Sequence, residues 1–283
     1  MCVLDGEEHH SPGSDDYHWR AVSEACANAP ESARIGIAIR DHAGGTWFSQ
    51  NEDMVFKAAS TVKLLILLAL ADRVTAQQTS LADRVEITPE QRVSGSGVLA
   101  WLDSASPLSV HDLAWLMIAV SDNTASNVLI DLVGLEAIDQ VQRDLGLSHT
   151  VLKRHFMRPV PGGPHNFTCA RDLVLILDAI AAHPRESAWM LSMLGDQQVT
   201  DRLARHLPDT VSFAGKSGWQ TGISHDSGIF TWKGKGVTAA VLTEDFLDSY
   251  AAAVFIGSIG AAILTDVELA TRTDGRISRR IES

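Results

Sequence analysis

The sequence predicts an α/β (α+β) fold: an antiparallel sheet flanked by helices, with an all-helical subdomain. Strand patterns are confined to the two ends of the chain, whereas the middle has the apolar spacing of helices. A long apolar helix follows the last strands. We therefore expect a single domain over 19–283, with an α/β subdomain of 19–59 and 206–283, a helical subdomain of 60–205, and a disordered tail over 1–18.

The composition is that of a soluble globular protein, 45% hydrophobic and 20% charged, and 283 residues can bury a large core. The net charge of −12, without a basic stripe, argues against nucleic acid and membrane surfaces as partners. Residues 1–18 lack the segments of a signal peptide, and three cysteines show no motif spacing. We expect a cytoplasmic protein, or a secreted or periplasmic one if a leader precedes this chain. The oligomeric state stays open.

The chain begins its ordered part with a helix and a hairpin. Residues 18–28 have apolar positions on one side, as in a helix packed on a core. Residues 33–40 alternate, a glycine-containing turn follows over 41–45, and the strand pattern resumes at 46–49. These segments predict the first strands of the sheet.

A serine and a lysine precede the most apolar segment of the chain. Residues 64–71 are apolar all round, which predicts a helix buried on every side. Ser60 lies near the start of this helix, and Lys63 lies one turn further on. A buried amine titrates below its usual range and can act as a base, and helix N–H groups can stabilise an oxyanion. Ser60 and Lys63 are therefore either a nucleophile and its base, or a capping serine and a surface-reaching lysine.

The middle of the chain carries a second polar motif between two helices. Residues 107–120 have helical apolar spacing, and 124–132 begin another helix. Ser121-Asp122-Asn123 lies between them, where it could also simply cap the second helix. The Gly/Ser-rich segment 93–98 lacks the rest of any nucleotide-binding motif.

The last third of the chain returns to strands. Residues 210–218 form a strand that contains Lys216-Ser217-Gly218, and 226–232 and 236–243 form a hairpin. Residues 248–265 form a long apolar helix, which we expect to pack flat on the sheet rather than to cross a membrane.

The three motifs together resemble a known signature. Ser-x-x-Lys, Ser-Asp-Asn and Lys-Thr-Gly, in this order, mark class A β-lactamases and penicillin-binding proteins. This chain has Ser60-x-x-Lys63, Ser121-Asp122-Asn123 and Lys216-Ser217-Gly218, with Ser in place of Thr in the last motif. The flanking strand and helix pattern is similar over nearly the whole chain beyond about residue 20. The chain thus resembles the penicillin-recognising serine hydrolases, nearest class A.

The resemblance implies a role for each motif residue and implies neither metal nor cofactor. Ser60 would be the nucleophile, Lys63 its base, and Ser121 a proton relay to the leaving amine. Substrate-binding roles would fall to Asn123, Asn166, Lys216, Ser217, Gly218 and Trp219. The Trp219 N–H would be the second oxyanion donor, and its large side chain would narrow the cleft or stack on an aromatic substrate.

One loop departs from the family pattern. Class A enzymes carry Glu-x-x-Leu-Asn, whose glutamate activates the deacylating water. Here Asn166 matches the asparagine best, but Gly162 stands in the place of the glutamate, and residues 148–168 hold no carboxylate. His155 and His165 are candidate bases, or else ordinary surface histidines.

The expected activity is acyl transfer from a small-molecule amide, lactam or ester to Ser60 and then to water. Class A-like β-lactamase activity is the first expectation. An esterase or D-alanyl-type peptidase, and a β-lactam-binding protein without turnover, remain alternatives, since the second step lacks a dedicated carboxylate base.

Overall fold

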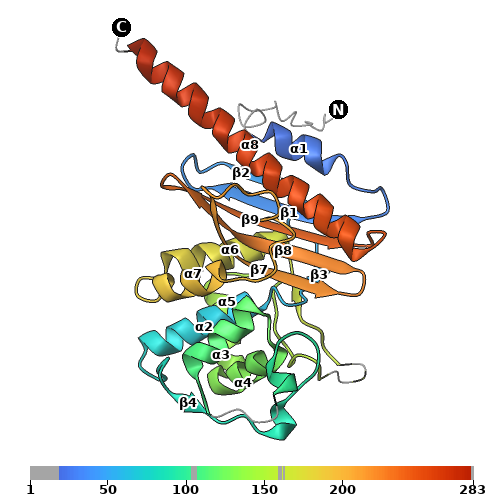
Figure 1. Ribbon diagram of the computed structural model, residues 1–283, viewed down its shortest axis with the longest axis vertical. Coiled ribbons are helices and arrows are strands. Elements are labelled where there is room, and N and C mark those ends of the chain that lie inside the picture. The colour runs from blue at the N-terminus through green and yellow to red at the C-terminus, as the bar shows by residue number, and fades with distance from the viewer. Residues whose placement is uncertain (1–18, 103–106, 159–160, 162, 282–283) are drawn as a thin grey trace, which may run out of the picture.

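The computed structural model describes residues 19–102, 107–158, 161 and 163–281, and the predicted tail 1–18 lies outside these residues (Figure 1). Its largest sheet has five antiparallel strands in the order β2-β1-β9-β8-β7. The strands are β1 (Arg34–Asp41), β2 (Trp47–Gln50), β7 (Ser212–Gln220), β8 (Ile223–Trp232) and β9 (Lys235–Glu244). Because β1 and β2 come from the start of the chain and the other three from its end, the predicted α/β fold is confirmed.

Four helices cover the two faces of this sheet (Figure 1). They are α1 (Arg20–Cys26) and α8 (Ser249–Ile281) on one face, and α6 (Ala170–Ala182) and α7 (Ser187–Gly195) on the other. The apolar stretch Ser249–Glu268 of α8 has a mean hydropathy of 1.7 and could span a bilayer by length, but 61% of it is buried. It packs on α1 and β8, so the predicted position flat on the sheet is confirmed.

The remaining helices form the lower part of the molecule in Figure 1. They are α2 (Lys63–Thr75), α3 (Val110–Ala119), α4 (Asn123–Val133) and α5 (Leu135–Asp144), with short 3-10 helices at Pro89–Gln91 and Leu99–Trp101. Residues 64–71 of α2 are all buried, as their unbroken apolar sequence predicted, and Lys63 before them is buried as well. The two-residue strands β3 (Phe56–Lys57), β4 (Arg84–Val85), β5 (Leu108–Ser109) and β6 (Phe167–Thr168) were not predicted, because two residues show no periodicity.

One apolar core joins the sheet to the helical part. Buried residues of α2 to α7 belong to the same cluster as Ala38, Ile229 and Ala240, which point from the sheet toward these helices. A second cluster lies between the other sheet face and α1 and α8. Helices α6 and α7 fall within the range 60–205 predicted for the helical subdomain, but they lie against the sheet. The limits of the two subdomains remain a prediction.

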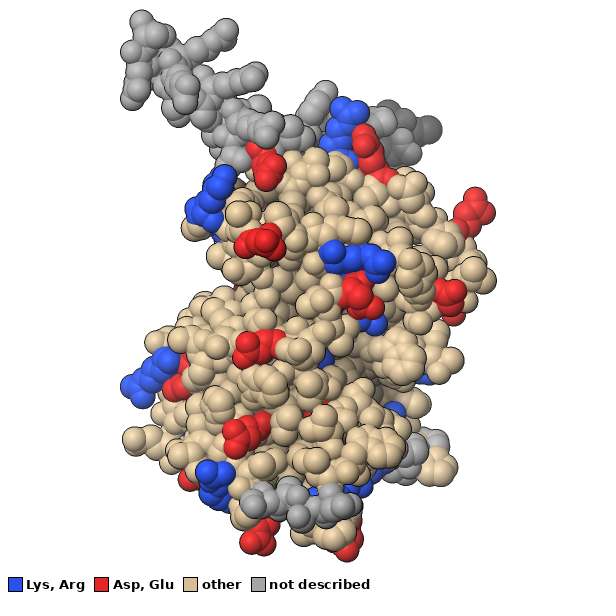
Figure 2. Space-filling view, viewed as in Figure 1, with Lys and Arg blue, Asp and Glu red and all other residues tan. Residues whose placement is uncertain are grey.

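The surface carries both signs of charge. On the face in Figure 2, Lys and Arg alternate with Asp and Glu, and neither sign forms a continuous patch. The buried thiols Cys26 and Cys169 are not bonded to each other, and burial raises their pKa to about 11 and about 12. They are therefore protonated and unreactive at neutral pH.

The burial of α2 predicts the cost of truncating it. Leu67→Ala should lower the free energy of unfolding by about 2–5 kcal/mol, because Leu67 is fully buried in the shared core. Leu247→Ala, at a side chain that is 92% exposed, should change it by less than about 0.5 kcal/mol. Urea denaturation of both variants measures the difference, and equal midpoints would contradict the core assignment.

Candidate active site

Ser60 lies in a tight turn between β3 and α2. Ala59 has a positive φ of 46°, which places the serine on a sharp corner. The N–H of Lys63 donates to the Ser60 carbonyl at 3.2 Å, and α2 begins only at Lys63. Ser60 thus precedes the helix, instead of capping it, and its side chain lies in the wall of a cleft.

The Lys63 amine joins the first two motifs. Its side chain is fully buried, and Nζ lies 2.6 Å from the Ser121 carbonyl oxygen and 3.0 Å from Asn123 Oδ1, to both of which it donates. The Ser121 hydroxyl lies 3.1 Å from the same nitrogen. A neutral amine has two hydrogens and one lone pair, so it can donate to both of these acceptors and still accept a proton from a hydroxyl.

The environment of Lys63 favours its neutral form. Burial holds the pKa of the Lys63 amine well below its usual range, and the positive charge of Lys216 lowers it further. The carboxylate of Asp122 opposes this shift to a smaller degree. The site therefore contains a buried amine whose neutral form is favoured, and its role as a base stays a prediction.

Asp122 holds the backbone that follows the Gly/Ser-rich segment 93–98, which contributes to the cleft wall. Its Oδ2 accepts from the N–H of Val98 at 2.7 Å and of Leu99 at 2.9 Å, and its Oδ1 caps α4 by accepting from Ala125 N–H. A Cβ at Gly97 would lie 2.3 Å from the Asp122 carboxylate, so only glycine fits there. Asp122 therefore caps α4, as the sequence allowed, and points inward.

Strand β7 packs directly on the Ser60 turn. A Cβ at Gly218 would lie 3.1 Å from the Ser60 nitrogen and from Ala59 Cβ. The glycine therefore makes room for the protein's own turn, whereas the resemblance had implied contact with a substrate backbone. This contact brings the third motif beside the nucleophile.

Lys216 is the second buried amine of the site. Nζ donates to the Ser217 carbonyl at 2.9 Å, and burial, reinforced by Arg202, lowers the pKa of Lys216 to about 7, although Asp226 acts in the opposite direction. Its proton is thus exchangeable near neutral pH.

Sequence reasoning missed the buried carboxyl group of Asp226, which lies opposite Ser217 on the neighbouring strand. Asp226 pairs with Ser217 across β7 and β8, and its Oδ2 accepts from Leu203 N–H at 3.0 Å. Burial raises the Asp226 pKa to about 7, although Arg202 lowers it in part. Arg202 Nε donates to Ser224 Oγ at 3.0 Å. Only the hairpin register could have pointed to Asp226, and nothing local marks Arg202.

A cleft of about 610 Å³ connects these residues to solvent. Trp219, which is 58% exposed, stands in its wall. The described residues that line it are Lys57, Ala59, Ser60, Gly95, Ser96, Asn123, Arg154, His155, Phe156, Met157, His165, Asn166, Trp219, Gln220 and Thr221. Four motif residues are buried and do not belong to this lining, namely Lys63, Ser121, Lys216 and Ser217. No group of three or more possible metal ligands occurs among the described residues.

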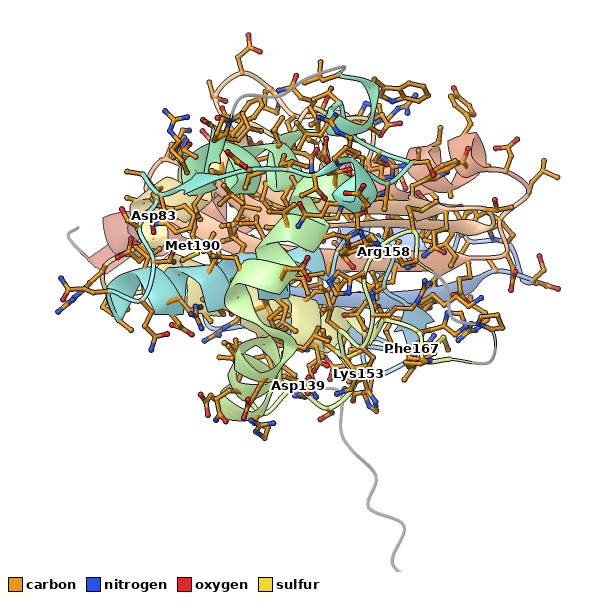
Figure 3. The ribbon with its side chains drawn as sticks, turned by 90° about the horizontal axis from the view of Figure 1, so that it is seen from below. Asp83, Asp139, Lys153, Arg158, Phe167 and Met190 are labelled. Carbon is orange, nitrogen blue, oxygen red and sulfur yellow. The ribbon has the colours of Figure 1, made fainter. Side chains whose placement is uncertain are left out.

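Asn166 holds the loop that forms one wall of the cleft. Its Oδ1 accepts from the N–H groups of Lys153 and Arg154 at 2.9 and 3.1 Å, and its Nδ2 donates to the Arg154 carbonyl at 3.0 Å. Lys153 also forms an ion pair with Asp139, which fixes the loop to α5 (Figure 3). The Asn166 amide is therefore engaged by the protein, although the residue lines the cleft.

The two candidate histidines occupy different settings. His155 Nε2 lies 2.7 Å from Asp131 Oδ1, so its ring is fixed by a carboxylate. The His165 ring makes an edge contact with Phe167, with ring centroids 6.1 Å apart. Both residues line the cleft.

Phe156 is the loop residue that contacts Lys63. Its ring centroid lies 4.6 Å from Lys63 Nζ, and its backbone is held by the Asn127 amide at 2.8 and 3.0 Å. Gly162, which the sequence matched to the family glutamate, lies outside the described residues. An aromatic ring therefore covers the amine on this side, a placement that no sequence signal indicated.

Comparison with known proteins finds beta-lactamases among the relatives of this chain. A sequence model of the beta-lactamase enzyme family matches residues 19–267. The beta-lactamase AER-1 of Aeromonas hydrophila is 29% identical over 199 residues, which are 66% of this chain and 64% of that protein.

Two solved structures resemble the fold. The crystal structure of a beta-lactamase from Sphaerobacter thermophilus is 36% identical, with a TM-score of 0.84 over 89% of this chain and 98% of that one. The structure of PBP-A, with a TM-score of 0.79 over 89% of this chain and 96% of that one, is 24% identical and shows the fold alone. Since the family match spans most of the sequence and includes all three motifs, the chain belongs to the beta-lactamase enzyme family.

Proposed function

We propose that the protein is a serine hydrolase that opens β-lactams through an acyl-enzyme on Ser60. The observation that carries this proposal is the buried Lys63 amine, which contacts Ser121 and Asn123, while Ser60 and Asn123 line the same cleft. Membership of the beta-lactamase enzyme family and the Sphaerobacter thermophilus relative support the same substrate class.

The first chemical step follows from the arrangement of the motifs. Neutral Lys63 takes the Ser60 hydroxyl proton while Oγ forms a bond to the lactam carbonyl carbon. The backbone N–H groups of Ser60 and Trp219 stabilise the resulting oxyanion. When the carbon–nitrogen bond breaks, the proton held by Lys63 passes through the Ser121 hydroxyl to the lactam nitrogen.

The second step is the slow one in this proposal. Hydrolysis of the acyl-enzyme needs a base that deprotonates a water beside the ester carbonyl. The described cleft lining contains no carboxylate, and the Phe156 ring occupies the space next to Lys63. This observation favours a long-lived acyl-enzyme, so a β-lactam-binding protein with little turnover is the second candidate function.

Removing the nucleophile tests the first step. After mixing with benzylpenicillin, wild type should gain the mass of one penicillin, and Ser60→Ala should gain none, because it lacks the attacking oxygen. Intact-protein mass spectrometry measures the adduct. Ser96→Ala, which removes another hydroxyl of the cleft lining, should still be labelled. Labelling of Ser60→Ala would contradict the assigned nucleophile.

Installing a base tests the second step. Phe156→Glu places a carboxylate beside Lys63 and should shorten the life of the acyl-enzyme by about 100- to 10,000-fold, the usual contribution of a general base. Phe156→Gln is the matched control, because glutamine has the same shape as glutamate but cannot act as a general base. The decay of the adduct mass over time measures both variants. Equal decay rates in the two variants would reject general-base catalysis at this position.

The two lysines predict a bell-shaped pH profile for acylation. The rate constant should fall on the acidic side as Lys63 becomes protonated, and this occurs far below the usual range because its pKa is lowered. It should fall again above a pH of about 7, as Lys216 loses the charge that attracts a substrate carboxylate. Lys216→Arg should move this alkaline limb upward, because a guanidinium stays protonated. An unmoved limb in a folded variant would remove Lys216 from this role.

A further inference from the structure

We propose that Arg154 and Lys57 form an anion subsite in the loop wall of the cleft, selecting β-lactams whose acyl side chain carries a carboxylate. This inference rests on the proposed function of the same cleft. It adds a second anion site to the one assigned to Lys216 and Ser217 on β7.

The cleft has the opposite charge from the chain as a whole. The chain carries a net charge of −12, yet the charged side chains in the described lining are Lys57 and Arg154, together with two histidines. One of these histidines, His155, is already paired with Asp131. Two positive charges therefore face the cleft without a described carboxylate in its wall.

Arg154 is held in place without a counter-charge. Its backbone N–H and carbonyl are both bonded to Asn166, whose amide is neutral. The Arg154 Nε is buried and has no hydrogen-bond partner among the described residues. By contrast, Arg40 is paired with the carboxylate of Asp178, and Arg171 with that of Glu52. Because this Nε is closed off from solvent, a ligand carboxylate would pair with the terminal nitrogens of the guanidinium, which share its positive charge.

Lys57 comes from a rigid element at the same wall. It pairs with Phe167 in the β3–β6 ladder, and its carbonyl accepts from His225 Nε2 at 3.0 Å. The His225 pKa is lowered to about 4 by burial, so this ring is neutral and adds no charge. The next residue, Ala58, donates its N–H to the Asn166 carbonyl at 2.9 Å. Asn166 thus connects the backbones that carry the two cations.

The two anion sites lie on different walls. Lys216 and Ser217 belong to β7, whereas Lys57 belongs to β3 and Arg154 to the loop that Asn166 holds. With the lactam ring carboxylate at β7 and the lactam carbonyl at Ser60, the acyl side chain has the loop wall as its remaining neighbour. A carboxylate on that side chain would be paired there, and a neutral side chain would leave Arg154 unsatisfied.

Benzylpenicillin and carbenicillin are a matched pair of probes, because carbenicillin adds one carboxylate to the same acyl side chain. The measurement is the second-order rate constant of Ser60 acylation by each compound. We expect the carbenicillin-to-benzylpenicillin ratio of wild type to fall by about tenfold or more in Arg154→Gln, the usual effect of losing a hydrogen bond to a charged group. Lys57→Gln, at an exposed residue that should not disturb folding, should lower the ratio in the same direction.

Arg158→Gln is the matched control. Arg158 lies on the same loop, donates to the Glu90 carbonyl at 3.0 Å and is absent from the described cleft lining, so the ratio should not change (Figure 3). An equal fall in Arg158→Gln would mean a general effect of net charge and would overturn the subsite. Labelling by both penicillins with an unchanged ratio in Arg154→Gln and Lys57→Gln would also overturn it, while the proposed function stood. Failure of both penicillins to label Ser60 would reject the proposed function itself, and the subsite with it.

Discussion

The burial of the Lys63 amine is the constraint on which the rest of the site depends. An ammonium group in an apolar core costs several kcal/mol unless it is neutralised or surrounded by acceptors. Here the acceptors come from the corner between α3 and α4, where Ser121 and Asn123 face the amine. That corner is in turn fixed by Asp122, which caps α4 and accepts a hydrogen bond from the N–H of Val98. One buried amine therefore ties α2, α3 and α4 into a single arrangement.

The second amine extends this arrangement to the sheet. Gly218 lets β7 approach the Ser60 turn, and Lys216 comes close enough to lower the pKa of Lys63. Two amines near each other cannot both stay protonated at low cost. Each contact that brings β7 closer therefore favours the neutral form of Lys63. The carboxylate of Asp226 offsets part of this repulsion by raising the pKa of Lys216, whereas the charge of Arg202 adds to it.

The two halves of the cleft have different chemical character. The wall formed by α2, α4 and β7 holds the groups needed for acylation, whereas the loop wall presents the Phe156 ring to Lys63 and the cations Arg154 and Lys57 to the cleft. An apolar ring excludes the water that would release an acyl group, and free cations attract an anionic side chain. In the proposed function, retention and selection of the acyl group thus fall to the same wall of the cleft.

The sequence alone determined the fold class, the three motifs and the all-round burial of α2, because these depend on periodicity and on short-range spacing that the chain itself displays. The inward position of Asp122 was also predictable, since it precedes a helix that needs a cap. Only the tertiary structure placed Gly218 against the Ser60 turn, Phe156 over Lys63 and Asp226 opposite Ser217. The first two contacts join segments far apart in the sequence, and the third depends on the register of the β7–β8 hairpin, so none of them leaves a local pattern.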